Sequence, residues 1–347
     1  MNNQTKTLLP AEWTKQDAIL LCWPHKSMDW QPILNEVETA FDSISYYICE
    51  SQTLIIIAHD EEHQAAIKQR LINKKARLSA VKWLLHTNND SWCRDFGPIT
   101  VLQDNKPLAL DCEFNGWGNK FPAQFDNQTN QLLAEQQLLS CPLLKTSLVL
   151  EGGSIDSDGH GTILTTSQCL LDQQRNPQLN QQQIEQQLKE LLGAKRIIWL
   201  QHGELEGDDT DSHVDNLARF CNPQTIAYAH CDDPDDSHYL PLQQLQAELQ
   251  QLTGLDGQPY QLLPLTIPKA LYYQQDRLPA SYVNFLITNE RVLMPTYNDP
   301  QDALNLEKLQ SVFSDRKVTG IDCSAVIRQS GSIHCLTMQL PRHTVNN

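Results

Sequence analysis

The chain has 347 residues, of which 40% are hydrophobic and 20% charged, as is typical of a globular protein. Its formal net charge of −16 disfavours nucleic acid or an anionic membrane as a partner and permits a cationic one. The N-terminal residues lack the basic start and apolar core of a signal peptide, and no apolar run approaches the ~20 residues needed to cross a bilayer. We therefore expect a cytoplasmic protein.

Ten cysteines are spread thinly through the chain, and none belongs to a C-x-x-C pair. This spacing indicates reduced thiols and argues against a zinc ribbon or thioredoxin chemistry.

Apolar residues at one helical face recur along the chain, beginning with Leu34, Val37 and Phe41. An initial strand is predicted over 18–22, followed by helix–strand pairs over 34–49 with 53–58, 61–71 with 81–85, 181–192 with 196–200, 242–252 with 261–265, and 303–313 with 318–321. No Pro-, Gly- or Ser-rich linker divides the chain. The pattern predicts a single α/β domain over 1–347, with its chemistry on the loops between the pairs.

The loop over 88–98 holds Trp92, Arg94 and Asp95 close together. A surface salt bridge beside a buried aromatic ring is one interpretation. The functional interpretation is that Asp95 faces a pocket while Arg94 holds the loop from behind. Similarly, Glu151 follows a strand predicted over 147–150 and precedes a Gly-Gly pair, which marks either an ordinary turn or a close approach of backbone to a ligand.

The segment over 207–216 is the densest acidic cluster, but it lacks the spacing and central glycine of an EF-hand. We expect it to be extended, so that the side chains of His213 and Asp215 point to the same face. Near the other end of the chain, Cys335 follows a Gly331-Ser332 turn and precedes a strand-like alternation. A cysteine there is either a small buried hydrophobic residue or a nucleophile whose pKa has been lowered.

One thiol, one histidine and several carboxylates suit attack on a planar cation, and a guanidinium fits best because carboxylates bind its N–H groups in pairs. Zinc held by His213, Asp215 and Cys335 is compatible by ligand type. No C-x-x-C or H-x-x-x-H spacing supports that alternative.

Six motifs in order resemble those of the agmatine deiminase family, which belongs with the bacterial-type peptidylarginine deiminases. They are WCRDFGP (92–98), FNGWG (114–118), EGGSI (151–155), HVDN (213–216), ASYVN (280–284) and GSIHC (331–335). The resemblance extends over nearly the whole chain. It implies the pentein fold, a five-bladed α/β propeller of pseudo-fivefold symmetry with a central active-site channel.

The resemblance also implies roles for individual residues. Cys335 matches the nucleophile and His213 the general acid/base, while Asp95 and Asp215 match the two carboxylates that clamp the guanidinium. Glu151 matches the glutamate that orients the histidine. The pocket-lining positions are matched by Trp92, Trp117 and Asn284. Two positions depart from the family pattern: Asp211-Ser212 stands where Asn-Gly is common, and the glycine-rich run before the cysteine is shortened.

The expected activity is hydrolysis of agmatine to N-carbamoylputrescine and ammonia through a covalent thiouronium intermediate, without metal or organic cofactor. One alternative is a deiminase of arginine or of a modified or peptidyl arginine, which Arg219 keeps open as a cation for the substrate carboxylate. A catalytically silent binding module is another alternative. The resemblance further suggests a homodimer.

Overall fold

The computed structural model describes residues 6–346, and most of its strands fall into five sheets of three or four strands. In each of these sheets an antiparallel pair continues into at least one parallel strand. Parallel pairing needs a long crossover, and helices lie in these crossovers. The same unit therefore recurs five times in the described chain.

The first sheet joins the two ends of the chain, because its strands β19 and β2 pair antiparallel with Met338 opposite Leu20. Its elements are β2 (Gln16–Cys22), α1 (Leu34–Ser51), β3 (Thr53–Ala58), α2 (Glu61–Lys74), β4 (Val81–Leu85) and β19 (Thr337–Pro341). The second sheet and its helices comprise β1 (Thr7–Leu8), β5 (Ile99–Gln103), β6 (Lys106–Glu113), α4 (Gly116–Asn119), α5 (Thr129–Glu135) and β7 (Leu143–Val149).

Three smaller sheets complete the repeat. The third unit comprises β8 (Ile155–Ser157), β9 (Thr162–Thr166), α6 (Ser167–Leu170), α7 (Gln181–Leu192) and β10 (Arg196–Leu200). The fourth comprises β11 (Ala218–Asn222), β12 (Thr225–His230), α9 (Tyr239–Leu249) and β13 (Gln261–Thr266). The fifth comprises β16 (Leu286–Ile287), β17 (Arg291–Thr296), α10 (Gln301–Val312) and β18 (Lys317–Asp322), and a hairpin of β14 (Tyr272–Tyr273) and β15 (Asp276–Arg277) precedes it.

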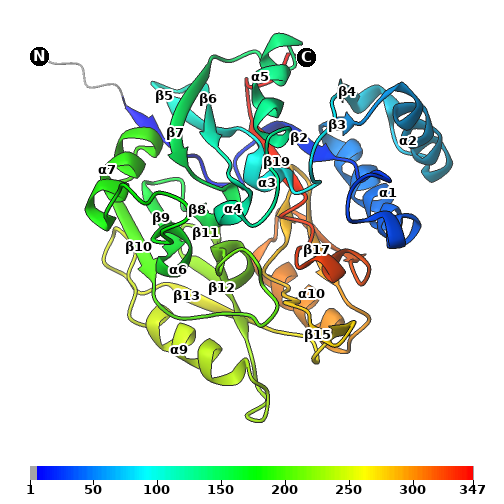
Figure 1. Cartoon of the computed structure of the whole chain (residues 1–347). Helices are drawn as coiled ribbons and strands as arrows, with labels where there is room; N and C mark the ends of the chain where they lie inside the picture. The colour runs from blue at the N-terminus through cyan, green and yellow to red at the C-terminus, as the bar shows by residue number, and fades with distance from the viewer. Residues whose placement is uncertain (1–5, 347) are drawn as a thin grey trace, which may run out of the picture.

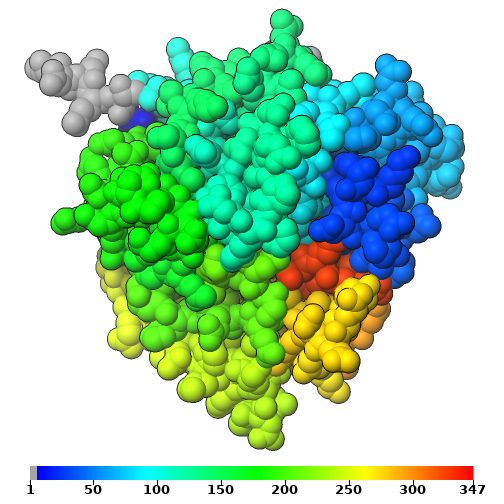
Figure 2. Space-filling model, in the orientation of Figure 1, coloured from blue at the N-terminus to red at the C-terminus, as the bar shows by residue number. Residues whose placement is uncertain are grey.

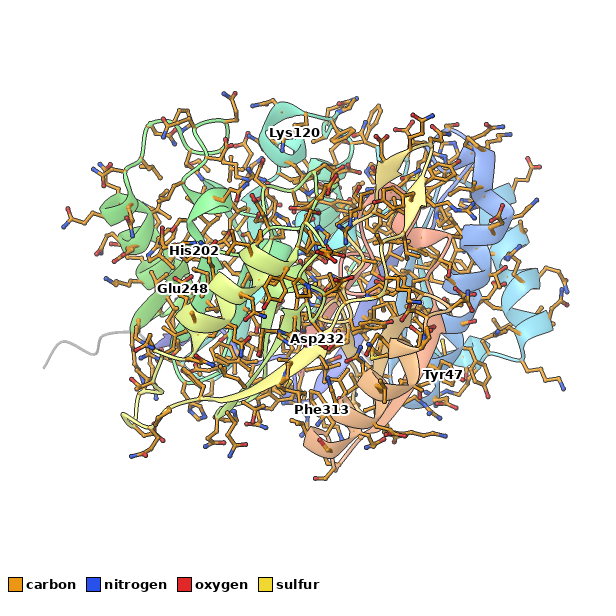
Figure 3. All side chains as sticks on the ribbon, turned by 90° about the horizontal axis from the view of Figure 1, so that it is seen from below. Tyr47, Lys120, His202, Asp232, Glu248 and Phe313 are labelled. Atoms are coloured by element: carbon orange, nitrogen blue, oxygen red, sulfur yellow. The ribbon has the colours of Figure 1, made fainter. Side chains whose placement is uncertain are left out.

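The long helices lie at the outside of the molecule, and the strands and short helices lie toward its middle (Figure 1). Strand β3 is a continuous apolar run with Leu54, Ile55 and Ile56 fully buried, as expected for a parallel strand covered on both faces. The fifth unit packs against the first: the Arg291 guanidinium lies 4.8 Å from the ring centre of Tyr47 in α1, at the right of Figure 3.

The predicted helix–strand pairs are confirmed, with shifts of a few residues at some ends. Helix α7 has the predicted bounds, beginning at a capping box of Asn180 and Gln183 and ending at Gly193 with φ 69°. Helix α9 begins three residues before the predicted start and ends three residues before the predicted end. No helix among residues 6–346 is long and apolar enough to cross a membrane.

Candidate active site

Five segments at equivalent places in the repeat form the site, since each precedes a strand of an antiparallel pair in its sheet. They are α3 (Cys93–Phe96) before β5, the 3-10 helix η4 (Gly152–Ser154) before β8, α8 (Val214–Leu217) before β11, residues 281–285 before β16 and residues 331–336 before β19. Helix α3 contacts η4 and β19, and α8 contacts η4. The repeat thus brings together motifs that are far apart in sequence.

The thiol of Cys335 is held by Asn284. The side-chain Nδ2 of Asn284 donates to Sγ of Cys335 at 3.0 Å, and its Oδ1 accepts from the amides of His334 at 3.0 Å and Cys335 at 3.3 Å. Burial, followed by the carboxylates of Asp215 and Asp95, raises the pKa of Cys335 well above its ordinary value. In the empty site this cysteine is therefore a neutral thiol near pH 7.

The Asp95 carboxylate is fixed by two donors. The amide of Gly153 donates to Oδ1 and the indole Nε1 of Trp117 donates to Oδ2, each at 2.9 Å. Trp117 reaches this position through a left-handed backbone with φ 54°, followed by Gly118 with φ 82°. Burial raises the pKa of Asp95 to about 6, with the nearby carboxylates adding to the effect.

Gly153 lies where three functional side chains meet. A Cβ added at this residue would lie 2.6 Å from Nδ1 of His213, 2.9 Å from Oδ1 of Asp95 and 3.1 Å from Oδ2 of Asp215. The segment predicted to be extended at 213–215 is in fact the start of helix α8, so that prediction is wrong. His213 and Asp215 nevertheless come together, because the helix turns just after His213.

The buried imidazole of His213 lies between two carboxylates. Nδ1 is 3.7 Å from Oδ1 of Asp95, and Nε2 is 3.6 Å from Oε2 of Glu151. Burial opposes charge on the ring, but the Asp95 carboxylate, Cys169 and Glu151 outweigh it and raise the pKa of His213 well above its ordinary value. The ring is therefore a cation in the empty site at neutral pH.

Arg175 anchors Glu151 behind this imidazole. Its Nε lies 3.0 and 2.9 Å from the two carboxylate oxygens of Glu151, and its Nη1 donates to Asp211 at 2.7 Å. Asp211 and Ser212 both have left-handed backbones, with φ 64° and 63°. That conformation explains why the related family commonly has Asn-Gly here. Sequence reasoning missed Arg175, since no pattern in the sequence connects it with the site.

Asp215 is bound on one oxygen only. Its Oδ2 lies 2.7 Å from Nδ1 of His334 and 3.5 Å from Sγ of Cys335. Its Oδ1 is buried without a hydrogen-bond partner among the described residues. Burial opposes the charge, but the hydrogen bond and charge of His334 lower the pKa of Asp215. The sequence motif contained His334, but no role was inferred for it.

A cavity of about 250 Å³ opens above these groups. Cys335, Asp95, Trp92 and Trp117 line it, whereas Asn284 does not. The other lining residues with charged side chains are Asp29, Asp90, Asp209 and Arg328. Figure 2 shows the C-terminal segment, in red-orange, emerging between the dark blue N-terminal region and the yellow hairpin region.

The acidic lining is crowded. Burial raises the pKa of Asp90 to about 7 and that of Asp209 to about 6, and neighbouring carboxylates add to both shifts. Such a lining is electrostatically matched to a cation. Asn284 and the His213–Asp215 pair lie in the protein beneath it, with Glu151 behind the imidazole, so the predicted site residues form one connected cluster.

Arg219 does not lie in this cavity, contrary to the expectation that it faces the far end of a substrate. Its side chain is fully buried and binds Glu12 and the carbonyl of Phe285, and its guanidinium lies 4.5 Å from the ring centre of Phe285. The cation that lines the cavity is Arg328, whose Nη1 is 2.9 Å from Oε2 of Glu36.

One candidate metal-ligand set occurs within residues 6–346: Glu151, Cys169 and His213 place donor atoms within 4.8 Å of one another. This set differs from the zinc ligands considered from the sequence. The Arg175 guanidinium already supplies a positive charge to Glu151 there.

The chain matches a family model described as Porphyromonas-type peptidyl-arginine deiminase over residues 8–341. The agmatine deiminase of Pseudomonas aeruginosa is 32% identical, with 98% of this chain and 99% of that protein covered. A crystal structure of a protein provisionally assigned as a peptidyl-arginine deiminase has a TM-score of 0.93 at 44% identity, covering 98% and 100% of the two chains. The C. Jejuni agmatine deiminase with substrate bound has a TM-score of 0.91 at 37% identity, covering 100% and 99%. These matches confirm the predicted α/β pentein fold.

Proposed function

The chain belongs to the Porphyromonas-type peptidyl-arginine deiminase family, and from that membership we propose that it is an agmatine deiminase. It would hydrolyse the guanidinium of agmatine to N-carbamoylputrescine and ammonia. The observation that carries the proposal is the joining of one thiol, one imidazole and two clamping carboxylates beneath an acidic cavity.

Asp95 and Asp215 hold the guanidinium flat through its N–H groups. Asp95 approaches it with the oxygens that Gly153 and Trp117 fix, and Asp215 uses its unpartnered Oδ1. The bound cation offsets the repulsion between the two carboxylates and lowers the cost of ionising Cys335. Substrate binding therefore favours the thiolate form of Cys335, which attacks the bound guanidinium.

The sulfur of Cys335 adds to the guanidinium carbon, and the C–N bond to one terminal amino group breaks. The thiol proton passes to the leaving nitrogen with His213 as the acid/base, so that neutral ammonia departs and a cationic thiouronium remains. Water then adds to that carbon, and the C–S bond breaks to restore the thiol and release the urea product and a proton. Glu151 and Arg175 keep the imidazole in place throughout.

The acidic lining supports agmatine as the substrate. The far end of agmatine is an ammonium, which fits the carboxylates of Asp29, Asp90 and Asp209, whereas arginine carries a carboxylate there. A second candidate, an arginine or peptidyl-arginine deiminase, is favoured by the description of the family model and by Arg328 in the cavity lining, but Arg328 already pairs with Glu36.

An ammonia-release assay with agmatine, free arginine and an N-blocked arginine amide separates the two candidates. We expect the highest kcat/KM for agmatine. Higher turnover of either arginine compound would favour the second candidate. Asp95→Asn, which keeps the size of the side chain but removes its charge and one of its two acceptors, should lower kcat/KM for agmatine by about 10- to 100-fold or more. Full activity in that variant would contradict the clamp.

A further inference from the structure

The side chain of His334 connects the clamp to a second buried charge cluster. The ring is 1% exposed, with Nδ1 2.7 Å from Oδ2 of Asp215 and Nε2 2.8 Å from Oε1 of Glu12. Its backbone is held as well, since its amide donates to Asn284 and its carbonyl accepts from Nε of Arg94 at 3.2 Å. His334, the residue before Cys335, thus contacts the clamping carboxylate of Asp215 through its side chain and not through its backbone.

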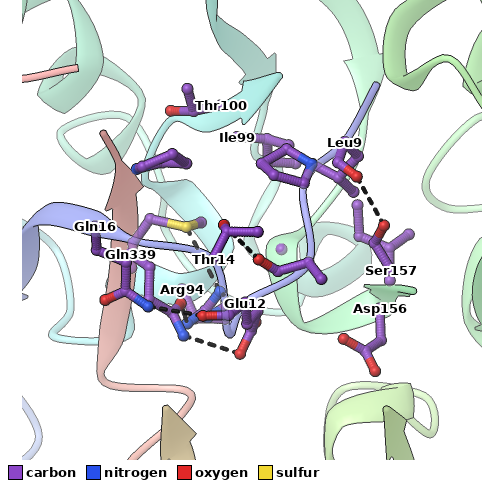
Figure 4. A pocket seen from close by; sticks show the side chains of 16 residues that line it. Leu9, Glu12, Thr14, Gln16, Arg94, Ile99, Thr100, Asp156, Ser157 and Gln339 are labelled. Carbon is purple, nitrogen blue, oxygen red and sulfur yellow. Dashed lines mark hydrogen bonds and ion pairs between the residues drawn. The ribbon is translucent and has the colours of Figure 1, made fainter. Parts of the chain in front are cut away.

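Glu12 is fixed from its other side. Arg94 lies 3.2 Å from Oε1, Arg219 contacts Oε2, and Nε2 of Gln339 donates to Oε2 at 2.8 Å. Glu12, Arg94 and Gln339 border a separate cavity of about 70 Å³, which Asp156 also lines, and Figure 4 shows Glu12 beside Arg94 and Gln339. Burial opposes the charge of Glu12, but Arg219, His334 and Arg94 lower its pKa well below the usual range.

The protons at the two ring nitrogens follow from these contacts. Carboxylate oxygens accept hydrogen bonds, so a ring nitrogen facing an ionised carboxylate must donate. Burial and the guanidiniums of Arg219 and Arg94 lower the pKa of His334, while Glu12 and Asp215 raise it. The lowered pKa leaves one proton on the ring at neutral pH, and this proton serves Asp215 when it lies on Nδ1.

We propose that His334 is a positioning residue: its Nδ1–H holds Oδ2 of Asp215, which leaves Oδ1 facing the substrate guanidinium. The proposal rests on the proposed function for its kinetic test. The groups that face this pair are Glu12, Arg94 and Arg219 around the imidazole, and His213, Asp95 and Cys335 around Asp215. The hydrogen bond from His334 keeps Asp215 ionised at a pH where Asp95 is still taking up a proton.

Two isosteric substitutions separate the two ring contacts. In His334→Asn the amide nitrogen occupies the place of Nδ1 and keeps the donor to Asp215, whereas in His334→Gln it occupies the place of Nε2 and keeps only the contact with Glu12. The measurement is kcat/KM for agmatine from pH 4 to 9, which reports groups of the free enzyme.

We expect His334→Gln to lower kcat/KM at pH 7 by about 10- to 100-fold, because one charge-assisted hydrogen bond to the clamp is lost. Without that donor the pKa of Asp215 rises toward that of Asp95. The acid limb of the pH profile should then steepen, because two carboxylates take up protons over the same pH range. His334→Asn should keep a one-proton acid limb and recover most of the lost kcat/KM. Equal losses in both variants with a one-proton limb, or a normal profile in His334→Gln, would overturn the proposal.

A binding measurement separates this proposal from the proposed function. In a Cys335→Ser background, calorimetry with agmatine and with guanidinium ion should show weaker binding for His334→Gln than for His334→Asn. If the unmodified enzyme releases no ammonia from agmatine, the proposed function fails, while this difference in guanidinium affinity still supports the role of His334. Equal affinities in the two variants would refute that role whatever the turnover.

Discussion

The amide of Gly153 donates a 2.9 Å hydrogen bond to Oδ1 of Asp95, and this contact exists because residue 153 has no side chain. A methyl group there would lie within 2.6 Å of the imidazole of His213. The position is thus limited by space, and the backbone does not adopt a positive φ there.

We expect Gly153→Ala to abolish ammonia release while the protein stays folded, because the Cβ would displace His213 and both clamping carboxylates. Ammonia release and circular dichroism check this together. Gly257→Ala is a matched control, since Gly257 has φ 79° but no neighbour within 4 Å of an added Cβ. It should cost about 1 kcal/mol of stability and leave turnover intact. An active Gly153→Ala enzyme would contradict this prediction, because it would show that His213, Asp95 and Asp215 can make room for the added Cβ.

The thiol of Cys335 should react slowly with iodoacetamide in the empty enzyme at pH 7. Its pKa is raised, so the thiolate fraction and the alkylation rate should increase by about tenfold per pH unit through neutral pH. Mass spectrometry of the peptide containing Cys335 measures this rate. Cys141, the one partly exposed cysteine among the residues described, should be replaced by alanine to remove background labelling without loss of activity. Rapid, pH-independent labelling of Cys335 would contradict a neutral thiol.

Glu151→Gln should move the alkaline limb of kcat to lower pH. The Glu151 charge helps raise the pKa of His213, and the proton on that ring is lost as pH rises through this raised pKa. Removing the charge lowers the pKa, so activity that depends on the protonated ring disappears earlier. The pH profile of kcat provides the measurement. Cys169→Ala should move the same limb in the same direction, because Cys169 also raises the pKa of His213. An alkaline limb unchanged in both variants would contradict the prediction.

Asp90→Asn should stabilise the empty protein in a pH-dependent way. Burial raises the pKa of Asp90 from its ordinary value of 3.8 to about 7, so the folded state disfavours its charge. Relative to the variant, the unmodified protein therefore loses free energy of unfolding as the pH rises from about 4 to about 7. Above that pH the difference between the two proteins stays constant. Melting temperatures of both proteins at pH 4, 6 and 8 test this.

Asp90→Asn should also raise KM for agmatine, since it removes a carboxylate from the cavity lining. Saturating agmatine should narrow the difference in melting temperature at pH 8, because the ligand offsets the repulsion that the variant removes. A stability difference independent of pH would mean that Asp90 is ionised at little cost.

Much of the fold was predictable because the hydrophobic periodicity of the helices is strong. The bounds of α7 followed from apolar spacing and Gly193, and both act within one helix. The segment over 213–215 misled because alternation is a weak signal over three residues, and Val214 instead begins a short helix packed beside η4.

Site residues could be predicted where they belong to the motifs of the related family. Residues that only bind and position those site residues could not be predicted. Cys335 and Asp95 could be placed by resemblance, whereas Glu12 and Arg175 bind the site residues from loops of no distinctive pattern. Arg219 was instead considered as a substrate-binding cation, although it does not line the cavity. Its charge was visible in the sequence, but its complete burial against Glu12 depends on long-range packing.

Strand β19, which follows the segment that carries Cys335, pairs with a strand near the start of the chain, since Thr337 lies opposite Leu21 of β2. During synthesis, Cys335 is therefore added only after all the other residues that line the cavity. A chain shortened before residue 335 would keep the carboxylates of Asp95 and Asp215 in its sequence but would lack the sulfur that attacks the substrate.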